Sequence, residues 1–121
     1  MVLVKRRLCL AAGFAGFEPA FDAEGPLSPK AGDSGARELR ALADSEGVRL
    51  PSLASGLYWQ HPLTAEGPAA RKTAEDIVRA QLDCAAALGV GAILVVPGTV
   101  GRGFWGGSEC TAYADAYARA Q

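Results

Sequence analysis

The residues best suited to chemistry lie in or just after short apolar runs of the sequence. Glu18 falls within the otherwise apolar run 16–22, where an ionised carboxylate is costly unless it is paired, hydrogen-bonded or bound to a metal. His61 is the only histidine, so no site in this chain can use two imidazoles. It lies beside Pro62 in a loop, where it can be a partly exposed surface residue or a residue that contacts the substrate. Glu18 is equally open to a structural and a functional role.

Two further segments carry side chains that suit a ligand. Tyr58 and Trp59 precede His61 and can form an apolar wall for a sugar ring, or pack in the core. The glycine-rich segment 98–107 can cradle a phosphate through its backbone N–H groups, with Arg102 as the charged partner, or serve as a flexible lid. The candidate substrate-binding residues are therefore Glu18, Tyr58, Trp59, His61 and Arg102. No catalytic residue or metal ligand is assigned.

The elements that must position these residues follow from a repeat in which a helical stretch runs through a glycine into a short strand. The glycines are Gly13, Gly47 and Gly89, where a helix ends and the chain reverses. Strands are expected at 16–22, 48–54 and 92–96, with helices at 36–45 and 69–88 between them. Strands joined through helices pair in parallel, so the sequence predicts an α/β fold with about three βα units.

The spacing of the glycines, about 34 and 42 residues, resembles the roughly 31 residues per unit of a (β/α)₈ barrel. The chain has 121 residues, so it can supply only about half of such a barrel. We therefore expect one domain, residues 1–121, that is a partial (β/α)₈ TIM barrel truncated within a helix at both ends. A flavodoxin-like sheet built from similar units is the structural alternative.

Composition excludes several classes of protein. Half of the residues are hydrophobic and the net charge is −1, so no basic surplus points to nucleic acid. No apolar run approaches the roughly 20 residues of a membrane helix, so no membrane partner is expected. Residues 5–17 imitate a secretory signal, but Gly13 and Gly16 break the apolar stretch in register with the repeat. Three widely spaced cysteines suggest neither disulfides nor a thiolate zinc site, and the expected location is cytoplasmic.

Three segments, taken in order, resemble one family. They are Ala12-Gly-Phe-Ala-Gly-Phe-Glu-Pro-Ala-Phe-Asp22, residues 50–64 (Leu-Pro-Ser-Leu-Ala-Ser-Gly-Leu-Tyr-Trp-Gln-His-Pro-Leu-Thr) and residues 88–98 (Leu-Gly-Val-Gly-Ala-Ile-Leu-Val-Val-Pro-Gly). Together they look like the xylose isomerase-like TIM barrels. Within these they are most similar to the sugar phosphate isomerases/epimerases, in the branch of L-ribulose-5-phosphate 3-epimerase and hexulose-6-phosphate isomerase. The likeness runs from about residue 8 to residue 121.

The resemblance implies an enzyme that moves a proton at a carbon next to a carbonyl, with a divalent metal (Mn, Mg, Co or Zn) polarising that carbonyl. Glu18 matches the glutamate at the end of the family's second strand, which lines the substrate pocket. Residues 58–61 match the region after its third strand, which contacts substrate. Some members carry a histidine slightly earlier than His61, so the region is transferred and a role is not. The family's metal ligands come from later strands, so none is expected in this chain.

The resemblance implies a sugar or sugar phosphate as the small-molecule partner, and an isolated chain that is inactive. Exposed strand edges predict a homo-oligomer or pairing with a complementing C-terminal half. A non-catalytic half-barrel that binds a sugar or phosphate, or self-associates, is the functional alternative. Pro19 departs from the family pattern and removes a ladder N–H, which predicts an edge strand or a locally irregular one.

Overall fold

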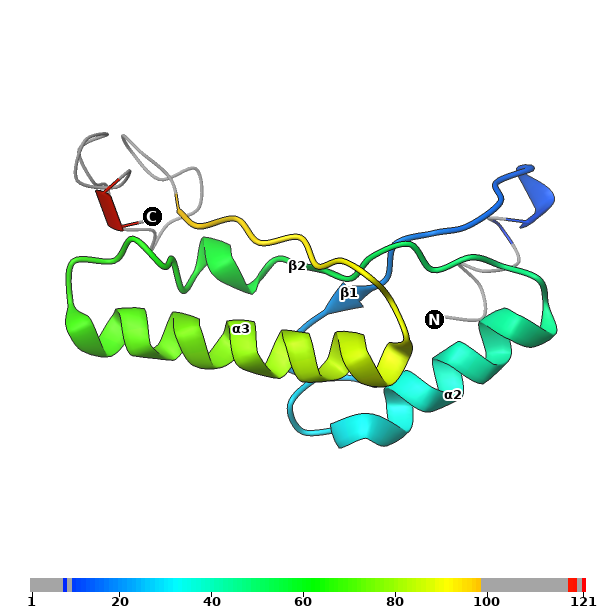
Figure 1. The fold of residues 1–121 in the computed structure, drawn as a ribbon, viewed down its shortest axis with the longest axis horizontal. Helices are drawn as coiled ribbons and strands as arrows, with labels where there is room; N and C mark the ends of the chain where they lie inside the picture. The colour runs from blue at the N-terminus through cyan, green and yellow to red at the C-terminus, as the bar shows by residue number, and fades with distance from the viewer. Residues whose placement is uncertain (1–7, 9, 99–117, 120) are drawn as a thin grey trace.

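The computed structural model describes residues 8, 10–98, 118–119 and 121. Its elements, in order, are strand β1 (Ala20–Phe21), helix α2 (Gly32–Ser45), strand β2 (Ala54–Ser55), the 3₁₀ helix η1 (Leu57–Trp59) and helix α3 (Pro68–Leu88) (Figure 1). β1 and β2 are parallel, with Ala20 opposite Ala54 and Phe21 opposite Ser55. A parallel bridge between Leu53 and Ile93 adds a third segment beside β2. The expected α/β fold with parallel strands is confirmed, and the described sheet is open.

The three repeat glycines adopt the backbone that the sequence predicts. Gly13, Gly47 and Gly89 have φ values of 80°, 65° and 71°, in the left-handed region where a side chain is strained. Gly89 ends α3 in this conformation, and its N–H bonds back to carbonyls of the last turn. The glycine positions therefore set where the chain leaves each helix for the next strand.

Helix α2 begins earlier than the sequence indicates, at Gly32 instead of Ala36. The preceding turn is held by the Ser28 hydroxyl, which donates to the Gly25 carbonyl at 2.7 Å. Gly35 packs so closely on the carbonyl group of Pro26 that an added Cβ would overlap it. This tertiary contact extends the helix through glycines whose own helix propensity is poor.

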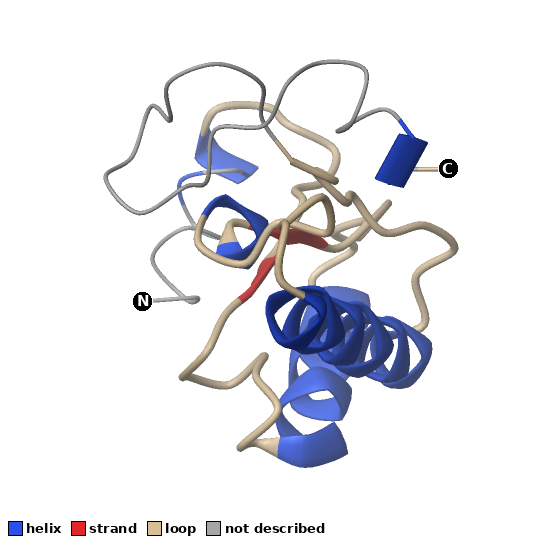
Figure 2. Cartoon of the chain, turned by 90° about the vertical axis from the view of Figure 1, so that its left-hand side faces the viewer, coloured by secondary structure: helices blue, strands red, loops and turns tan. Residues whose placement is uncertain are grey.

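The helices cover one face of the sheet. Figure 2 shows α2 and α3 on the same side of the two strands. A buried apolar cluster fills the space between them, and its members are Phe21, Leu27, Ala36, Leu39, Ala43, Leu50, Leu53, Cys84, Ala85 and Leu88. Glu18, Ala20 and Leu94 are exposed on the opposite face, which we call the open face. No helix in the described part of the chain is long and apolar enough to span a membrane.

β1 and β2 each continue an extended segment, 16–21 for the first strand and 49–55 for the second. The pairing of these two segments changes register by one residue along their length. Gly16 bridges Arg49, whereas Ala20 lies opposite Ala54, so residues 17–19 face the longer segment 50–53. Pro19 and Pro51 both lie in this interval, and neither has an N–H to donate. Flanking bonds run from Phe17 N to Arg49 O and from Ala54 N to Pro19 O, each 3.1 Å. The pairing is therefore irregular opposite Pro19, but the extra residue is a bulge in the second strand, within 50–53, and not in the strand that contains Pro19.

The bulge changes which side chains of the second strand face the helices. Leu50 before it and Leu53 after it are both buried, although strict alternation would point them to opposite faces. Ser52, next to Leu53, is directed away from the helices as a result. The insertion of one residue thus places a hydroxyl on the open face.

Candidate functional site

Glu18 and Ser52 meet on the open face of the sheet. Pro19 and Phe21 are buried toward the helices, so the alternation of the strand turns Glu18 the other way. The Ser52 hydroxyl donates a hydrogen bond to Oε2 of Glu18. Glu18 is exposed, so the burial cost that made it notable in the sequence does not arise. Its carboxylate is instead oriented by a neighbouring strand, which leaves it able to accept a hydrogen bond or a proton.

Tyr58 lies in the core and is 1 % exposed. Its hydroxyl donates to Oε1 of Gln81 at 2.5 Å. Burial raises the pKa of the Tyr58 hydroxyl above its ordinary value, which keeps it a donor. Of the two roles open to this aromatic side chain, the structure places it in core packing.

Gln81 is fully buried on α3 and joins three parts of the fold. Its Nε2 donates to the carbonyl oxygen of Leu53 at 2.8 Å and to that of Leu94 at 3.3 Å. Its Oε1 accepts the hydrogen bond from Tyr58, so the one amide has partners in η1, in the second strand and in the third segment. This one side chain therefore fixes where the loop after β2 leaves the sheet.

Trp59 and His61 follow at the carboxyl end of β2 and are half-buried. His61 N donates to Leu57 O at 2.9 Å, which extends the η1 turn. Thr64 N donates to Pro97 O at 3.2 Å, so this loop lies beside the end of the third segment. The loop is thus where the sequence predicts it, next to the strand ends. Arg102 and most of the segment 98–107 lie outside the described residues.

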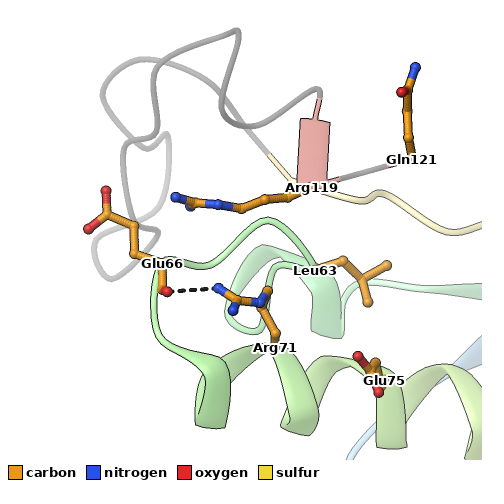
Figure 3. Close-up of a pocket in the computed structure, with 6 residues that line it drawn as sticks. All are labelled: Leu63, Glu66, Arg71, Glu75, Arg119 and Gln121. Carbon is orange, nitrogen blue, oxygen red and sulfur yellow. Dashed lines mark hydrogen bonds between the residues drawn. The ribbon is translucent and has the colours of Figure 1, made fainter.

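A cavity of about 640 Å³ opens beside this loop, as Figure 3 shows. Its lining includes Leu63, Glu66, Arg71, Glu75, Arg119 and Gln121. Arg71 Nη1 donates to the carbonyls of Ala65 and Glu66 at 2.8 and 2.7 Å. Arg119 Nη1 donates to Thr64 O at 2.9 Å. Consecutive carbonyls thus hold two guanidinium groups, and two glutamates also line the cavity.

The sequence predictions did not include Gln81, Arg71 or Arg119. A signal for Gln81 existed, because it is a polar residue on the apolar stripe of its helix, and buried polar groups need partners. No local sequence pattern predicts that the two arginines line the same cavity, because this depends on contacts between distant parts of the chain.

A divalent metal centre does not fit the residues that the structure describes. Among them, no group of three or more His, Cys, Asp or Glu side chains could hold a metal ion. The hydrogen-bond partner of Glu18 is a hydroxyl rather than a second carboxylate. We therefore derive no chemical step through a metal from these residues.

Comparison with known proteins gives one family match. A family model described as xylose isomerase-like TIM barrel matches residues 6–121. No curated protein was found to match the sequence. The match spans all the strands and helices described above, and the open face of the sheet is the one that a barrel of parallel strands turns inward.

Proposed function

Because the chain belongs to the xylose isomerase-like TIM barrel family, we propose that it contributes the Glu18 side of a carbohydrate isomerase or epimerase site. The observation that carries this proposal is the hydrogen bond from Ser52 to Glu18 on the open face. A carboxylate facing the inside of a barrel can bind a sugar hydroxyl, or take a proton from a carbon next to a carbonyl.

Ser52 gives Glu18 a defined orientation. Its hydroxyl occupies Oε2, while Oε1 has no partner in the described part of the chain. The second oxygen is then free for a substrate hydroxyl or proton. The bulge at Pro51 supports this arrangement, since a regular strand would turn Ser52 toward the helices.

The substrate that we propose is a ketose or its phosphate, of the kind that the sugar phosphate isomerase/epimerase branch acts on. Half-buried Trp59 and His61 lie at the carboxyl end of β2, where parallel α/β folds bind their ligands. A divalent metal, which the resemblance implies, would need ligands beyond the described residues. We therefore expect sugar binding without turnover from this chain alone.

The experiment that tests this proposal is an NMR titration of the ¹⁵N-labelled chain with D-ribulose and with D-ribulose 5-phosphate. The largest amide shifts for both ligands should fall at Glu18, Ser52 and their neighbours on the open face. Shifts confined to other parts of the molecule, or no binding of either ligand, would remove Glu18 from the site.

Self-association is a second candidate role, and a specific observation favours it. Leu94 is 51 % exposed on the open face, beside the small side chains of Ala20 and Ala54. An apolar sheet face with open edges favours association with another chain. The oligomeric state of the purified chain tests this role.

A further inference from the structure

A second cavity, of about 610 Å³, lies toward the amino-terminal ends of the strands. Its described lining is formed by Ala15, Gly16, Arg40, Arg49, Leu50 and Pro51. Arg40 comes from α2 and Arg49 from the start of the second strand. These lining residues include two guanidinium groups and no carboxylate, whereas the described lining of the cavity beside Arg71 includes two glutamates.

Arg40 has hydrogen-bonding capacity that the described residues leave unused. Its Nη2 donates to Oδ1 of Asp44 at 2.8 Å, one turn further along α2. Its Nε is buried and has no hydrogen-bond partner. Because this Nε has almost no exposed surface, a ligand would meet the outer nitrogens of the guanidinium, whose side chain is 28 % exposed. Among them, Nη1 has no hydrogen-bond partner in the described part of the chain and is able to donate to an oxygen atom of a bound ligand.

Arg49 has a fixed main chain and an unpaired side chain. Its N–H donates to Ala15 O at 3.0 Å and its carbonyl accepts from Phe17 N at 3.1 Å. Its exposed guanidinium has no hydrogen-bond or ion-pair partner in the described part of the chain. Gly16 packs so closely on the Arg49 backbone that a Cβ there would crowd the Arg49 carbonyl. The ladder thus holds Arg49 at the cavity and leaves its charge available.

We propose that Arg40 and Arg49 bind the phosphate group of a small phosphomonoester in this cavity. A guanidinium fork matches phosphate geometry, and three non-bridging oxygens can serve two such forks, whereas a carboxylate offers only two oxygens. Leu50 and Pro51 provide an apolar wall for the organic part of the ligand. This site is separate from Glu18 and does not depend on the proposed function.

The test uses the full chain with inorganic phosphate as the probe and acetate as the comparison anion at equal ionic strength. Calorimetry gives the affinities, and a ¹⁵N spectrum of the arginine side chains follows the Arg40 Nε–H. Phosphate should shift that resonance and bind more tightly than acetate. Arg49→Gln should weaken phosphate binding about tenfold or more, because it removes one of two charged forks.

Two further variants separate this site from general surface attraction. Arg40→Lys keeps the charge but replaces the guanidinium fork by a single ammonium group, so it should also weaken phosphate binding. Arg79→Gln removes an exposed arginine of α3 that does not line the cavity, so it should leave the affinity unchanged. The proposal fails if phosphate does not bind at tens of millimolar, if acetate binds equally well, or if Arg79→Gln and Arg49→Gln weaken binding equally.

Discussion

The Tyr58 hydroxyl donates a hydrogen bond to the side-chain carbonyl of Gln81, in a part of the core where both side chains are at most 1 % exposed. The same amide donates to main-chain carbonyls of Leu53 and Leu94. The residue before β2, the third segment and the loop carrying the candidate aromatic residues are therefore joined by one side chain of α3. On the far side of β2 the sheet continues only through the single bridge between Leu53 and Ile93. The hydrogen bonds of Gln81 therefore help to hold the loop at this edge of the sheet.

Replacing Gln81 by leucine should cost about 2–4 kcal/mol of unfolding free energy, because the buried Tyr58 hydroxyl and the Leu94 carbonyl lose their amide partner. Tyr58→Phe removes only one partner and should cost about 1 kcal/mol. Gln60→Leu, at an exposed position after η1, is the matched control and should change little. Urea denaturation measures all three, and equal losses for the Gln81 and Gln60 variants would contradict the account.

Alkaline pH should destabilise the fold through Tyr58. Burial raises the pKa of its hydroxyl in the folded state above the ordinary value of 10.0. The folded state then holds this proton more tightly than the unfolded state, so the contribution is complete below pH 10 and is lost as the pH rises through the folded pKa. Denaturation at several pH values above 10 should show a smaller loss for Tyr58→Phe than for wild type. Identical slopes would show that this hydroxyl does not contribute.

Gly35 should not tolerate alanine, although alanine is the better helix former. The added Cβ would overlap the Pro26 carbonyl oxygen, and relieving this overlap by moving the backbone costs about 1–3 kcal/mol. That cost outweighs the gain of up to about 1 kcal/mol from helix propensity. Gly56→Ala is the control, since its Cβ meets nothing within 4 Å and its φ is −87°. A thermal melt in which Gly35→Ala is the more stable of the two would be the opposing result.

Leu94 should control self-association. Leu94 and Leu82 are each 51 % exposed, but Leu94 lies on the open face of the sheet and Leu82 lies on α3. Leu94→Glu should therefore shift the chain toward monomer in sedimentation velocity, while Leu82→Glu leaves its association unchanged. A wild-type chain that is monomeric at every concentration, or equal effects of both substitutions, would exclude association through the open face.

The sequence predicts well those features that depend on local backbone chemistry. The left-handed conformations of Gly13, Gly47 and Gly89, and helix α3 to within a residue of its start, follow from glycine positions and helical spacing. The register shift at Pro51 is different, because it depends on how two distant segments pair. The early start of α2 likewise depends on the contact between Gly35 and Pro26.

The same distinction applies to the candidate site. The sequence pointed to Glu18 as an unusual carboxylate, and the loop at Tyr58 to His61 was expected beside the strand ends. It did not reveal the Ser52 contact, because only the one-residue bulge turns that hydroxyl toward Glu18. The sequence also could not decide whether Tyr58 packs in the core or forms an apolar wall for a ligand. The residue that decides this, Gln81, lies on another helix.

The central claim, that Glu18 binds the sugar, is tested most directly by the affinity of D-ribulose for two glutamate variants. Glu18→Gln removes the charge on the open face, and Glu38→Gln removes one from an exposed position of α2. We predict that Glu18→Gln weakens binding about tenfold, the loss of one charge-assisted hydrogen bond, while Glu38→Gln binds like wild type. Equal affinities for the two variants would contradict the claim.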